Sequence, residues 1–297
     1  MTEWAWLARR MERMAKAKKI AYQGEPGANS HIACRAVYPN FEPLPCNTFE
    51  DALAAIADGT AELGMIPIEN SIAGRVADIH HFLPGSGLHI VGEYFLPIRF
   101  QLMALPDATL ATIRTVYSHT HALGQCRKII RKLELTPVTA VDTAGSAREV
   151  SQSGDLTRAS LAPELAAEIY GLKILMRDVE DEKHNTTRFV VLSRVADWAR
   201  PNNGDTVTTF VFRVRNVPAA LYKALGGFAT NGVNMTKLES YMVDGEFSAT
   251  MFLADVQGHP EDLPLKRALE ELTFFTTELR ILGVYPAHAF RNEQQND

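Results

Sequence analysis

The sequence predicts an α/β protein with parallel sheets, followed by a smaller α+β unit of the ferredoxin-like type. Three observations predict this fold class. Short apolar runs alternate with helical patterns over 20–192, which is typical of β-α units and parallel sheets. A stretch rich in proline, asparagine and glycine at 196–206 indicates a linker. The segment 207–285 then has the order βαββαβ.

The composition is that of an ordinary globular protein and argues against several classes of function. Hydrophobic residues make up 46% of the 297 residues, and charged residues make up 22%. A net charge of −5 gives no basic footprint for nucleic acid, and no apolar run is long enough to span a membrane. Three cysteines without metal-ligand spacing, Cys34, Cys46 and Cys126, indicate reduced thiols in a cytoplasmic protein. We therefore expect neither a nucleic-acid nor a membrane partner.

The two ends of the chain are expected to lie outside the fold. Residues 1–18 mix aromatic, aliphatic and basic side chains, and they lack the apolar run and cleavage site of a secretory signal. Glu3 and Glu12 also argue against a targeting peptide. We expect a short, partly helical extension there, and a tail at 286–297 that is disordered from Arg291.

The first strands and helices follow from apolar runs and their flanking polar residues. Thr48 is typical of an N-cap, and Gly59 is typical of the end of the same helix. The glycine-bearing turn at 24–30 presents backbone N–H groups, but it lacks both nucleotide-binding fingerprints, so a plain β-α turn is favoured. The predicted strands cover 20–23, 63–67, 89–105 with a break at Pro97, 115–117, 138–141, 159–161, 172–176 and 185–192. The predicted helices cover 31–38, 49–57, 69–76 and 164–170, and two others end near 133 and 150.

Polar residues gather where these strands end. Glu69, Asn70 and Ser71 follow one strand, and capping explains only one of the three. Ser118 and Thr143 follow later strands. Because ligands bind at the carboxyl ends of strands in α/β folds, these positions are candidate binding residues.

The stretch 185–189, Asn-Thr-Thr-Arg-Phe, stands at the mouth of a buried strand. The hydroxyls of Thr186 and Thr187 can donate hydrogen bonds to a ligand, and Arg188 can hold a carboxylate with two parallel bonds. For each residue taken alone, the structural explanation, as a strand residue or a solvated charge, is the stronger one. The stretch becomes informative only together with the others.

The second part of the chain has its own pattern. The residues 210–214 alternate in a way that predicts one apolar sheet face left free by the helices, and hence association into a dimer or larger. Asp244-Gly245 is a hairpin signal. The predicted strands cover 210–214, 234–242, 247–253 and 278–285, and the predicted helices cover 218–230 and 261–272.

Taken together, these stretches resemble prephenate dehydratases, which make phenylpyruvate on the way to phenylalanine. The last part resembles the ACT regulatory domain that these enzymes carry. The resemblance covers about residues 19–285. The matching stretches are 24–30, 67–71, 118–119 with 125–126, 142–144 and 185–189.

The resemblance implies a two-lobed catalytic domain over 19–195, similar to periplasmic binding proteins, with the substrate cleft between the lobes. It also implies an ACT domain over 207–285 that binds L-phenylalanine as an effector, in a homodimer or homotetramer. The residues before the first strand are too few for the chorismate mutase domain of some relatives, so one activity is expected.

The chemistry of this reaction fits the residues. Prephenate carries two carboxylates and a ring hydroxyl, and loss of CO₂ and hydroxide makes a benzene ring. The reaction needs a proton donor, carboxylate clamps and a dry pocket, so we expect no metal or other cofactor. The resemblance gives Thr187 the donor role. The expected substrate contacts are Glu69, which is equally well a structural cap, and Asn70, Ser71, Ser118, Thr143, Arg188 and Phe189. Arg188 would orient either a substrate carboxylate or the strand itself.

Three stretches depart from the family's pattern. Thr120-His121 replaces the usual Pro-Gln, and we favour a helix start at His121 over a site residue. In the ACT-like part, 219–221 and 239–242 replace Gly-Ala-Leu and Glu-Ser-Arg-Pro, which alters the approach to an effector. The expected effector contacts are Ala219, Ala220, Leu221, Asn234, Glu239 and Ser240.

Three other functions remain open at this point. An arogenate dehydratase differs only in a substrate amino group. A solute-binding or amino-acid-sensing module would share the two-lobed fold without catalysis. A metal hydrolase would use His80 with His81, or His119 with His121, but neither pair has a convincing third ligand.

Overall fold

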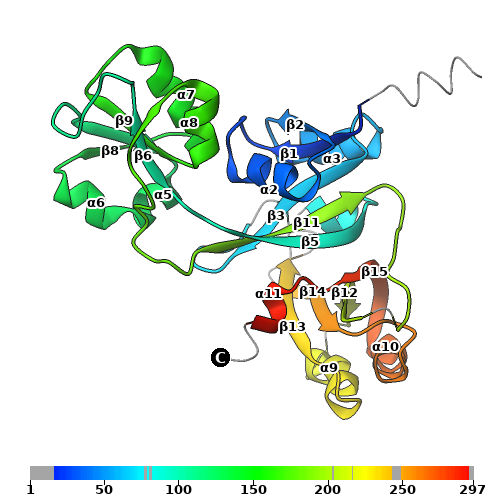
Figure 1. Cartoon of the computed structure of the whole chain (residues 1–297). Coiled ribbons are helices and arrows are strands. Elements are labelled where there is room, and N and C mark those ends of the chain that lie inside the picture. Colours follow the sequence, from blue (N-terminus) through cyan, green and yellow to red (C-terminus); the bar gives the residue numbers. More distant parts are fainter. Residues whose placement is uncertain are drawn as a thin grey trace, which may run out of the picture. The chain divides into compact units, whose positions relative to one another are not determined.

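The structure is a computed structural model that describes residues 17–76, 79, 82–202, 204–215, 217–242 and 249–293. The chain divides into two compact units, each built from two segments of the sequence. The helices and strands of both units are labelled in Figure 1. Unit 1 comprises Met1–Arg75 and Leu96–Thr187, and unit 2 comprises Val76–Phe95 and Arg188–Asp297. Most of the predicted N-terminal extension and the predicted Asp244-Gly245 turn fall outside the described residues.

The first lobe of unit 1 is a small parallel sheet with the strand order β3-β1-β2. Its central strand is buried, with Ile20 and Ala21 fully inaccessible. The predicted cap is confirmed, because Thr48 Oγ1 accepts a hydrogen bond from the backbone N–H of Asp51 at 3.1 Å. The elements are β1 (Lys19–Gln23), α2 (Asn29–Val37), β2 (Glu42–Cys46), α3 (Phe49–Ala57) and β3 (Leu63–Asn70).

The predicted helix over 69–76 is wrong. β3 continues to Asn70, and after a turn β4 (Gly74–Arg75) pairs antiparallel with it. The side chain of Asn70 decides this, because its Oδ1 accepts hydrogen bonds from the N–H groups of Ile72 and Ala73 at 3.0 and 2.8 Å. Gly74 then adopts a left-handed conformation, with φ of +79°.

The second lobe of unit 1 is a five-stranded sheet with the order β10-β6-β9-β7-β8. The sheet is mixed rather than fully parallel as predicted, because β6 pairs antiparallel with both of its neighbours. The predicted helix to residue 133 is interrupted at Cys126. The strands are β6 (Gln101–Ala104), β7 (Thr115–Ser118), β8 (Thr136–Thr139), β9 (Arg158–Ala162) and β10 (Lys173–Met176). The helices are α5 (Thr120–Gln125), α6 (Arg127–Lys132), α7 (Thr143–Ser153) and α8 (Glu164–Tyr170).

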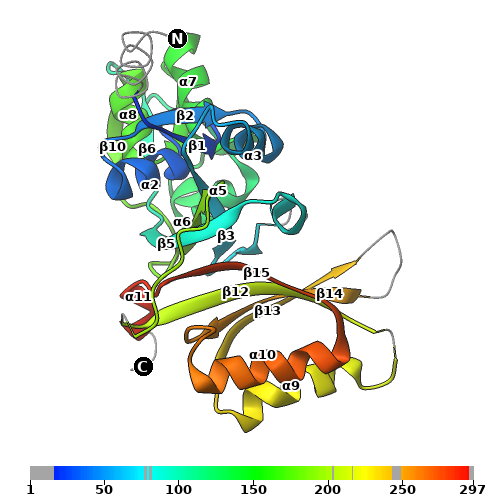
Figure 2. The same ribbon diagram turned by 90° about the vertical axis from the view of Figure 1, so that its right-hand side faces the viewer.

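Unit 2 contains the predicted βαββαβ order, with α9 and α10 lying on one face of the sheet (Figure 2). The strand order is β13-β14-β12-β15-β5-β11. The strands are β5 (His89–Pro97) and β11 (Thr186–Ser193), which both begin or end in unit 1, and β12 (Thr206–Val214), β13 (Met235–Met242), β14 (Ala249–Gln257) and β15 (Thr276–Pro286). The helices are η1 (Leu83–Gly85), α9 (Ala220–Thr230), α10 (Leu263–Phe275) and α11 (Phe290–Glu293).

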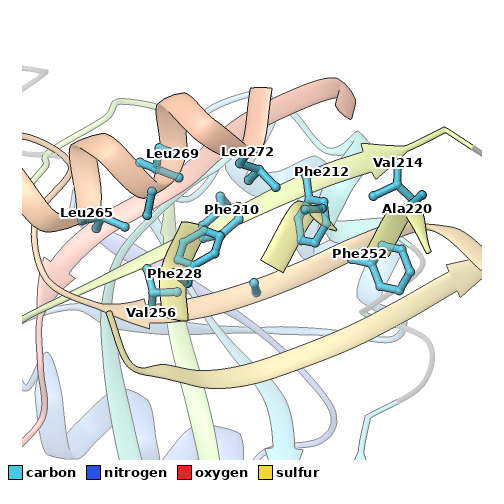
Figure 3. Close-up of a cluster of buried hydrophobic side chains, with 13 residues drawn as sticks. Phe210, Phe212, Val214, Ala220, Phe228, Phe252, Val256, Leu265, Leu269 and Leu272 are labelled. Carbon is cyan, nitrogen blue, oxygen red and sulfur yellow. The ribbon is translucent and has the colours of Figure 1, made fainter. Parts of the chain in front are cut away.

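The core of unit 2 lies between the sheet and its two helices (Figure 3). Phe210 stacks on Phe228 with 5.8 Å between ring centroids, and Phe212 stacks on Phe252 at 5.3 Å. Burying each such side chain contributes about 1.5–3 kcal/mol. The alternation of apolar residues along β12 therefore fixes which face of the sheet receives the helices.

Two expectations for unit 2 are wrong. Val211 and Leu253, which point away from the helices, are fully buried within the single chain, so the predicted exposed apolar face is absent from the described part of the sheet. The tail is ordered at least to Glu293, because Arg291 in α11 makes ion pairs with Glu93. Association into a homodimer or homotetramer stays a prediction, but an exposed apolar sheet face no longer supports it.

Candidate active site

The hydroxyl of Thr187 is the centre of the candidate site. Thr187 lies near the start of β11 and is 9% exposed. Its Oγ1 accepts a hydrogen bond from Asn70 Nδ2 at 3.0 Å. A hydroxyl has one proton to donate, and the described residues offer no acceptor for this one. The Thr187 hydroxyl is therefore oriented as a proton donor.

The Asn70 amide is itself fixed in orientation. Its Oδ1 accepts the two backbone N–H groups of the turn that follows β3, so its Nδ2 must face β11. There Nδ2 also lies 2.7 Å from Asn185 Oδ1. Asn185 is fully buried, and its own Nδ2 donates to Gln125 Oε1 at 2.7 Å. A chain of amides thus runs from α5 through Asn185 and Asn70 to Thr187.

Ser71 has a structural role in this conformation. Its hydroxyl donates to the carbonyl of His184 at 2.7 Å and accepts from the N–H of Thr186 at 2.9 Å. Its backbone N–H donates to the Thr186 carbonyl at 2.9 Å. The expected substrate contact by Ser71 is replaced by bonds that hold β11 beside the end of β3.

Two other expected substrate contacts are buried among protein atoms. Ser118 is inaccessible, and its hydroxyl donates to the Leu161 carbonyl at 2.6 Å, which joins β7 to β9. Phe189 is only 1% exposed and belongs to the core. Thr143, at the start of α7, and Glu69, opposite Arg75 in the β3–β4 ladder, are partly exposed and remain candidates.

We had expected Arg188 to hold a substrate carboxylate, but its position in the structure does not allow this. Its side chain is 3% exposed and lies in unit 2, where it donates to Glu93 at 2.9 Å and to the Tyr285 hydroxyl at 2.9 Å. It also forms an ion pair with Asp255 at 2.5 Å. The physical reason is the alternation of side chains along a strand, which points Arg188 to the opposite side from Thr187.

The turn at 24–30 brings the two lobes of unit 1 into contact. The Tyr170 hydroxyl donates to the Pro26 carbonyl at 2.9 Å, and Arg148 forms an ion pair with Glu25 at 2.9 Å. A Cβ atom on Gly27 would lie 2.8 Å from the Cα of Ala166. This turn therefore packs backbone against backbone on α8, rather than serving as an open anion site.

His119 is the N-cap of α5. His119 Nδ1 accepts from the N–H of His121 at 3.3 Å, which confirms the predicted helix start. Burial and the neighbouring His121 lower the pKa of His119 below 6.5. Within the described ranges no group of three or more His, Cys, Asp or Glu residues could hold a metal ion, and His80-His81 lies outside them. None of the described helices is both long and apolar enough to cross a membrane.

The expected effector residues lie at the start of α9 and along β13. Ala219 has φ of +60°, a left-handed conformation that favours the glycine usual in the family. Ala220 is buried and Leu221 packs on the core of unit 2. Asn234 donates to Gln257 at 3.1 Å, whereas Glu239 and Ser240 lie on the strand at the end of the sheet.

The family sequence model described as "Prephenate dehydratase" matches residues 20–197. The chain belongs to the prephenate dehydratase family. It is 54% identical to a bifunctional N-acyl-homoserine lactone acylase/prephenate dehydratase of Komagataeibacter europaeus, over 92% of this chain and 98% of that protein. It is 36% identical to arogenate dehydratase/prephenate dehydratase 2, chloroplastic, of Arabidopsis thaliana, over 90% of this chain and 72% of the relative.

Solved structures agree with this membership of the prephenate dehydratase family. GqqA, described as a novel type of quorum quenching acylase, superposes with a TM-score of 0.87 at 54% identity, over 92% of this chain and 100% of that one. A prephenate dehydratase from Arthrobacter aurescens in complex with L-Phe superposes with a TM-score of 0.83 at 30% identity, over 91% of this chain and 90% of that one.

Two residues of the site were missed as site residues from the sequence. Asn185 and Gln125 belong to stretches that resemble the family, yet neither was expected to act beside Thr187. Each is a neutral amide whose partners are distant in sequence, by 115 residues for Asn185 with Asn70 and by 60 for Asn185 with Gln125. The available signal was the resemblance of 125–126 and 185–189 to the family, and only the fold shows that these stretches meet.

Proposed function

We propose that this protein is a prephenate dehydratase in which Thr187 is the general acid. The observation that carries the proposal is the hydrogen bond from Asn70 Nδ2 to Thr187 Oγ1, 3.0 Å long. It fills an acceptor position of the hydroxyl and leaves the proton to be donated. Membership of the family over 20–197 supports the same reaction.

The proposed reaction balances with one proton from solvent and no other reactant. Thr187 donates its proton to the ring hydroxyl of prephenate, and the C–O bond breaks to release water. The bond between the ring and its carboxylate breaks as CO₂ leaves, and its electron pair completes the aromatic ring of phenylpyruvate. The Thr187 alkoxide then takes a proton from solvent, which restores the hydroxyl.

A threonine hydroxyl is a weak acid, so the alkoxide needs stabilisation at the moment of transfer. Asn70 Nδ2 is the donor that supplies it, because it already faces Oγ1 and gains strength as negative charge develops there. Fixed donors to a developing oxyanion are worth about 10²–10³-fold in rate. The amide chain from Gln125 keeps this donor in place, so little rearrangement accompanies proton transfer.

The test is turnover of prephenate and of arogenate by the purified chain, with phenylpyruvate and phenylalanine as the respective products. We expect prephenate turnover that depends on Thr187. Arogenate stays the alternative substrate, because plant relatives such as arogenate dehydratase 1 of Petunia hybrida, 36% identical, are named for it. Absence of turnover on both substrates would contradict the proposal.

A second candidate function is hydrolysis of N-acyl-homoserine lactones. The observation that favours it is the 54% identity to a relative with that activity in its name, over nearly the whole length of both chains. Amide hydrolysis needs an activated nucleophile, and in this structure Asn70 donates to Thr187, which weakens the hydroxyl as a nucleophile. Release of a fatty acid from an N-acyl-homoserine lactone, compared between the parent and Thr187→Ala, would show whether the two activities share the site.

We also propose that the βαββαβ part of unit 2 is an ACT domain and that L-phenylalanine is its effector. The solved relative with bound L-Phe supports this. The proposed contacts are the backbone at the start of α9 and the side chains of Asn234, Glu239 and Ser240. Titrating Phe, Tyr and Trp against prephenate turnover, with Glu239→Ala alongside, tests it. No rate change and no binding by calorimetry at millimolar concentration would contradict it.

A further inference from the structure

A network of buried polar side chains surrounds Arg188 in unit 2. Arg188 donates to Glu93 on β5, to the Tyr285 hydroxyl on β15 and to Asp255 on β14. Arg291 on α11 donates to both carboxylate oxygens of Glu93, at 2.6 and 2.8 Å. Side chains from β5, β14 and β15 thus contact the Arg188 guanidinium of β11, and α11 contacts its partner Glu93.

The hydrogen bonds of this network form a closed ring. The Thr209 hydroxyl donates to Asp255 Oδ1 at 2.6 Å, so the 2.7 Å bond between Thr209 and Tyr285 must use the Tyr285 proton. The Tyr285 hydroxyl in turn accepts from Arg188 at 2.9 Å. The donor of each hydrogen bond is therefore fixed: Arg188 donates to Tyr285, Tyr285 to Thr209, and Thr209 to Asp255. The ion pair between Asp255 and Arg188 closes the ring.

Compared with an apolar core, the network adds little net stability, although its buried charges must stay paired. Arg188 and Arg291 balance the charges of Glu93 and Asp255, and the two carboxylate side chains are 0% and 1% exposed. For such buried pairs the cost of removing the charges from water cancels much of their attraction. What the ring does provide is one defined position and orientation for the Arg188 guanidinium.

That position matters because of the residue before it. Thr187 is the last residue of unit 1 in this part of the chain, and Arg188 is the first residue of unit 2, and both belong to β11. Neighbouring strand residues point to opposite sides, so rotation of β11 that displaces one side chain displaces the other. Asn70 fixes the strand from the Thr187 side, and the ring fixes it from the Arg188 side.

We propose that Arg188 is a positioning residue for Thr187. Because Asp255, Tyr285 and Thr209 hold Arg188 in place, the orientation of the Thr187 hydroxyl depends on the sheet of unit 2. The inference rests on the proposed prephenate dehydratase function. It assigns a role in turnover to residues that lie in the C-terminal unit and that the proposed reaction does not require at the substrate.

The test compares two substitutions in the ring with one outside it. Asp255→Asn removes a charge that Arg188 needs, and Tyr285→Phe opens the ring while keeping the size of the side chain. Leu269→Ala is the matched control, because it weakens the core on the helix face of the same sheet and leaves the ring intact. We expect kcat per folded molecule to fall about 10- to 100-fold in Asp255→Asn, by less in Tyr285→Phe, and not at all in Leu269→Ala, with KM unchanged.

A double-mutant cycle with Thr187→Ala separates positioning from a loss of folded protein. If Arg188 and its partners act through the Thr187 hydroxyl, Asp255→Asn lowers kcat in the parent but causes no further loss in Thr187→Ala. Equal losses in both backgrounds, normal kcat in both ring variants, or an equal loss in Leu269→Ala would overturn the inference. An unvaried protein inactive on prephenate would instead overturn the proposed function. If Asp255→Asn does not fold, Tyr285→Phe gives the same cycle.

Discussion

Asn70 Nδ2 donates a hydrogen bond to Thr187 Oγ1 across 3.0 Å, which joins the end of β3 to the start of β11. The two backbone N–H groups that Asn70 Oδ1 accepts leave its amide no alternative orientation. The Asn70 side chain therefore stabilises a turn and also orients the Thr187 hydroxyl. This double use explains why a polar residue stands at the end of an otherwise buried strand.

Replacing Asn70 by aspartate should abolish the orientation of the Thr187 hydroxyl as a proton donor. A carboxylate at this place accepts the Thr187 proton instead of donating to Oγ1, so we expect kcat on prephenate to fall about 10²–10³-fold. Steady-state kinetics of the folded variant measures this. Asn47→Asp is the control, since Asn47 is exposed and should tolerate the same change. An equal kcat in the parent and Asn70→Asp would contradict the role given to the amide.

Gln125→Ala should mainly lower stability. It leaves the buried Nδ2 of Asn185 without its acceptor, and an unsatisfied buried donor costs about 1–3 kcal/mol in the free energy of unfolding. Urea unfolding checks the value, and kcat should fall less than in Asn70→Asp. Gln125→Glu restores an acceptor at the same place. Unfolding of the alanine and glutamate variants at the same urea concentration would contradict the role given to the hydrogen bond between Gln125 and Asn185.

Gly27→Ala should push the two lobes of unit 1 apart. Gly27 has φ of +96°, and its new Cβ would lie 2.8 Å from the backbone of Ala166. We expect a lower kcat/KM on prephenate. Gly154→Ala is the control, because Gly154 also has a positive φ, of +64°, but no atom lies within 4 Å of its added Cβ. Similar activity losses in both variants would attribute the effect to backbone strain alone.

The network around Arg188 predicts a pH dependence of stability. Burial raises the pKa of Glu93, but the hydrogen bond from Arg291 and the charges of Arg188 and Arg291 outweigh it and hold the pKa below 4.5. The folded state thus favours the charged carboxylate. Its contribution to stability is present above pH 4.5 and is lost as the pH falls through the lowered pKa.

Urea unfolding at several pH values measures this contribution. The free energy of unfolding should decrease below about pH 4.5 in the parent, and the decrease should be shallower in Glu93→Gln. If the variant unfolds but keeps the full slope, other carboxylates account for the acid sensitivity.

The sequence predicted local structure best where one residue type decides it. Thr48 caps α3 as predicted, and the helix over 164–170 has its predicted bounds, because capping and apolar periodicity are local properties. The helix predicted over 69–76 failed because Asn70 bonds to the turn and to β11 at once. That second partner, Thr187, lies 117 positions away in the sequence, so no local pattern contains it.

The site was predicted in part for the same reason. Thr187 and Asn70 stood out as polar residues at strand ends, and the structure brings them together. Arg188 stood out as a cation that could hold a substrate carboxylate, but its partners Glu93 and Asp255 come from distant strands, and its charge is neutralised in the interior. Sequence reasoning found which residues are unusual for their place, and tertiary pairing decided what each of them does.

The measurement that bears most directly on Thr187 is kcat for prephenate in Thr187→Ala, with circular dichroism to show that the variant is folded. Removal of a general acid typically costs about 10²–10⁴-fold, and we predict a loss in that range. Thr186→Ala should be milder, because its side chain points to the other side of β11. A folded Thr187→Ala variant with near-normal kcat would contradict the assignment of Thr187 as the acid.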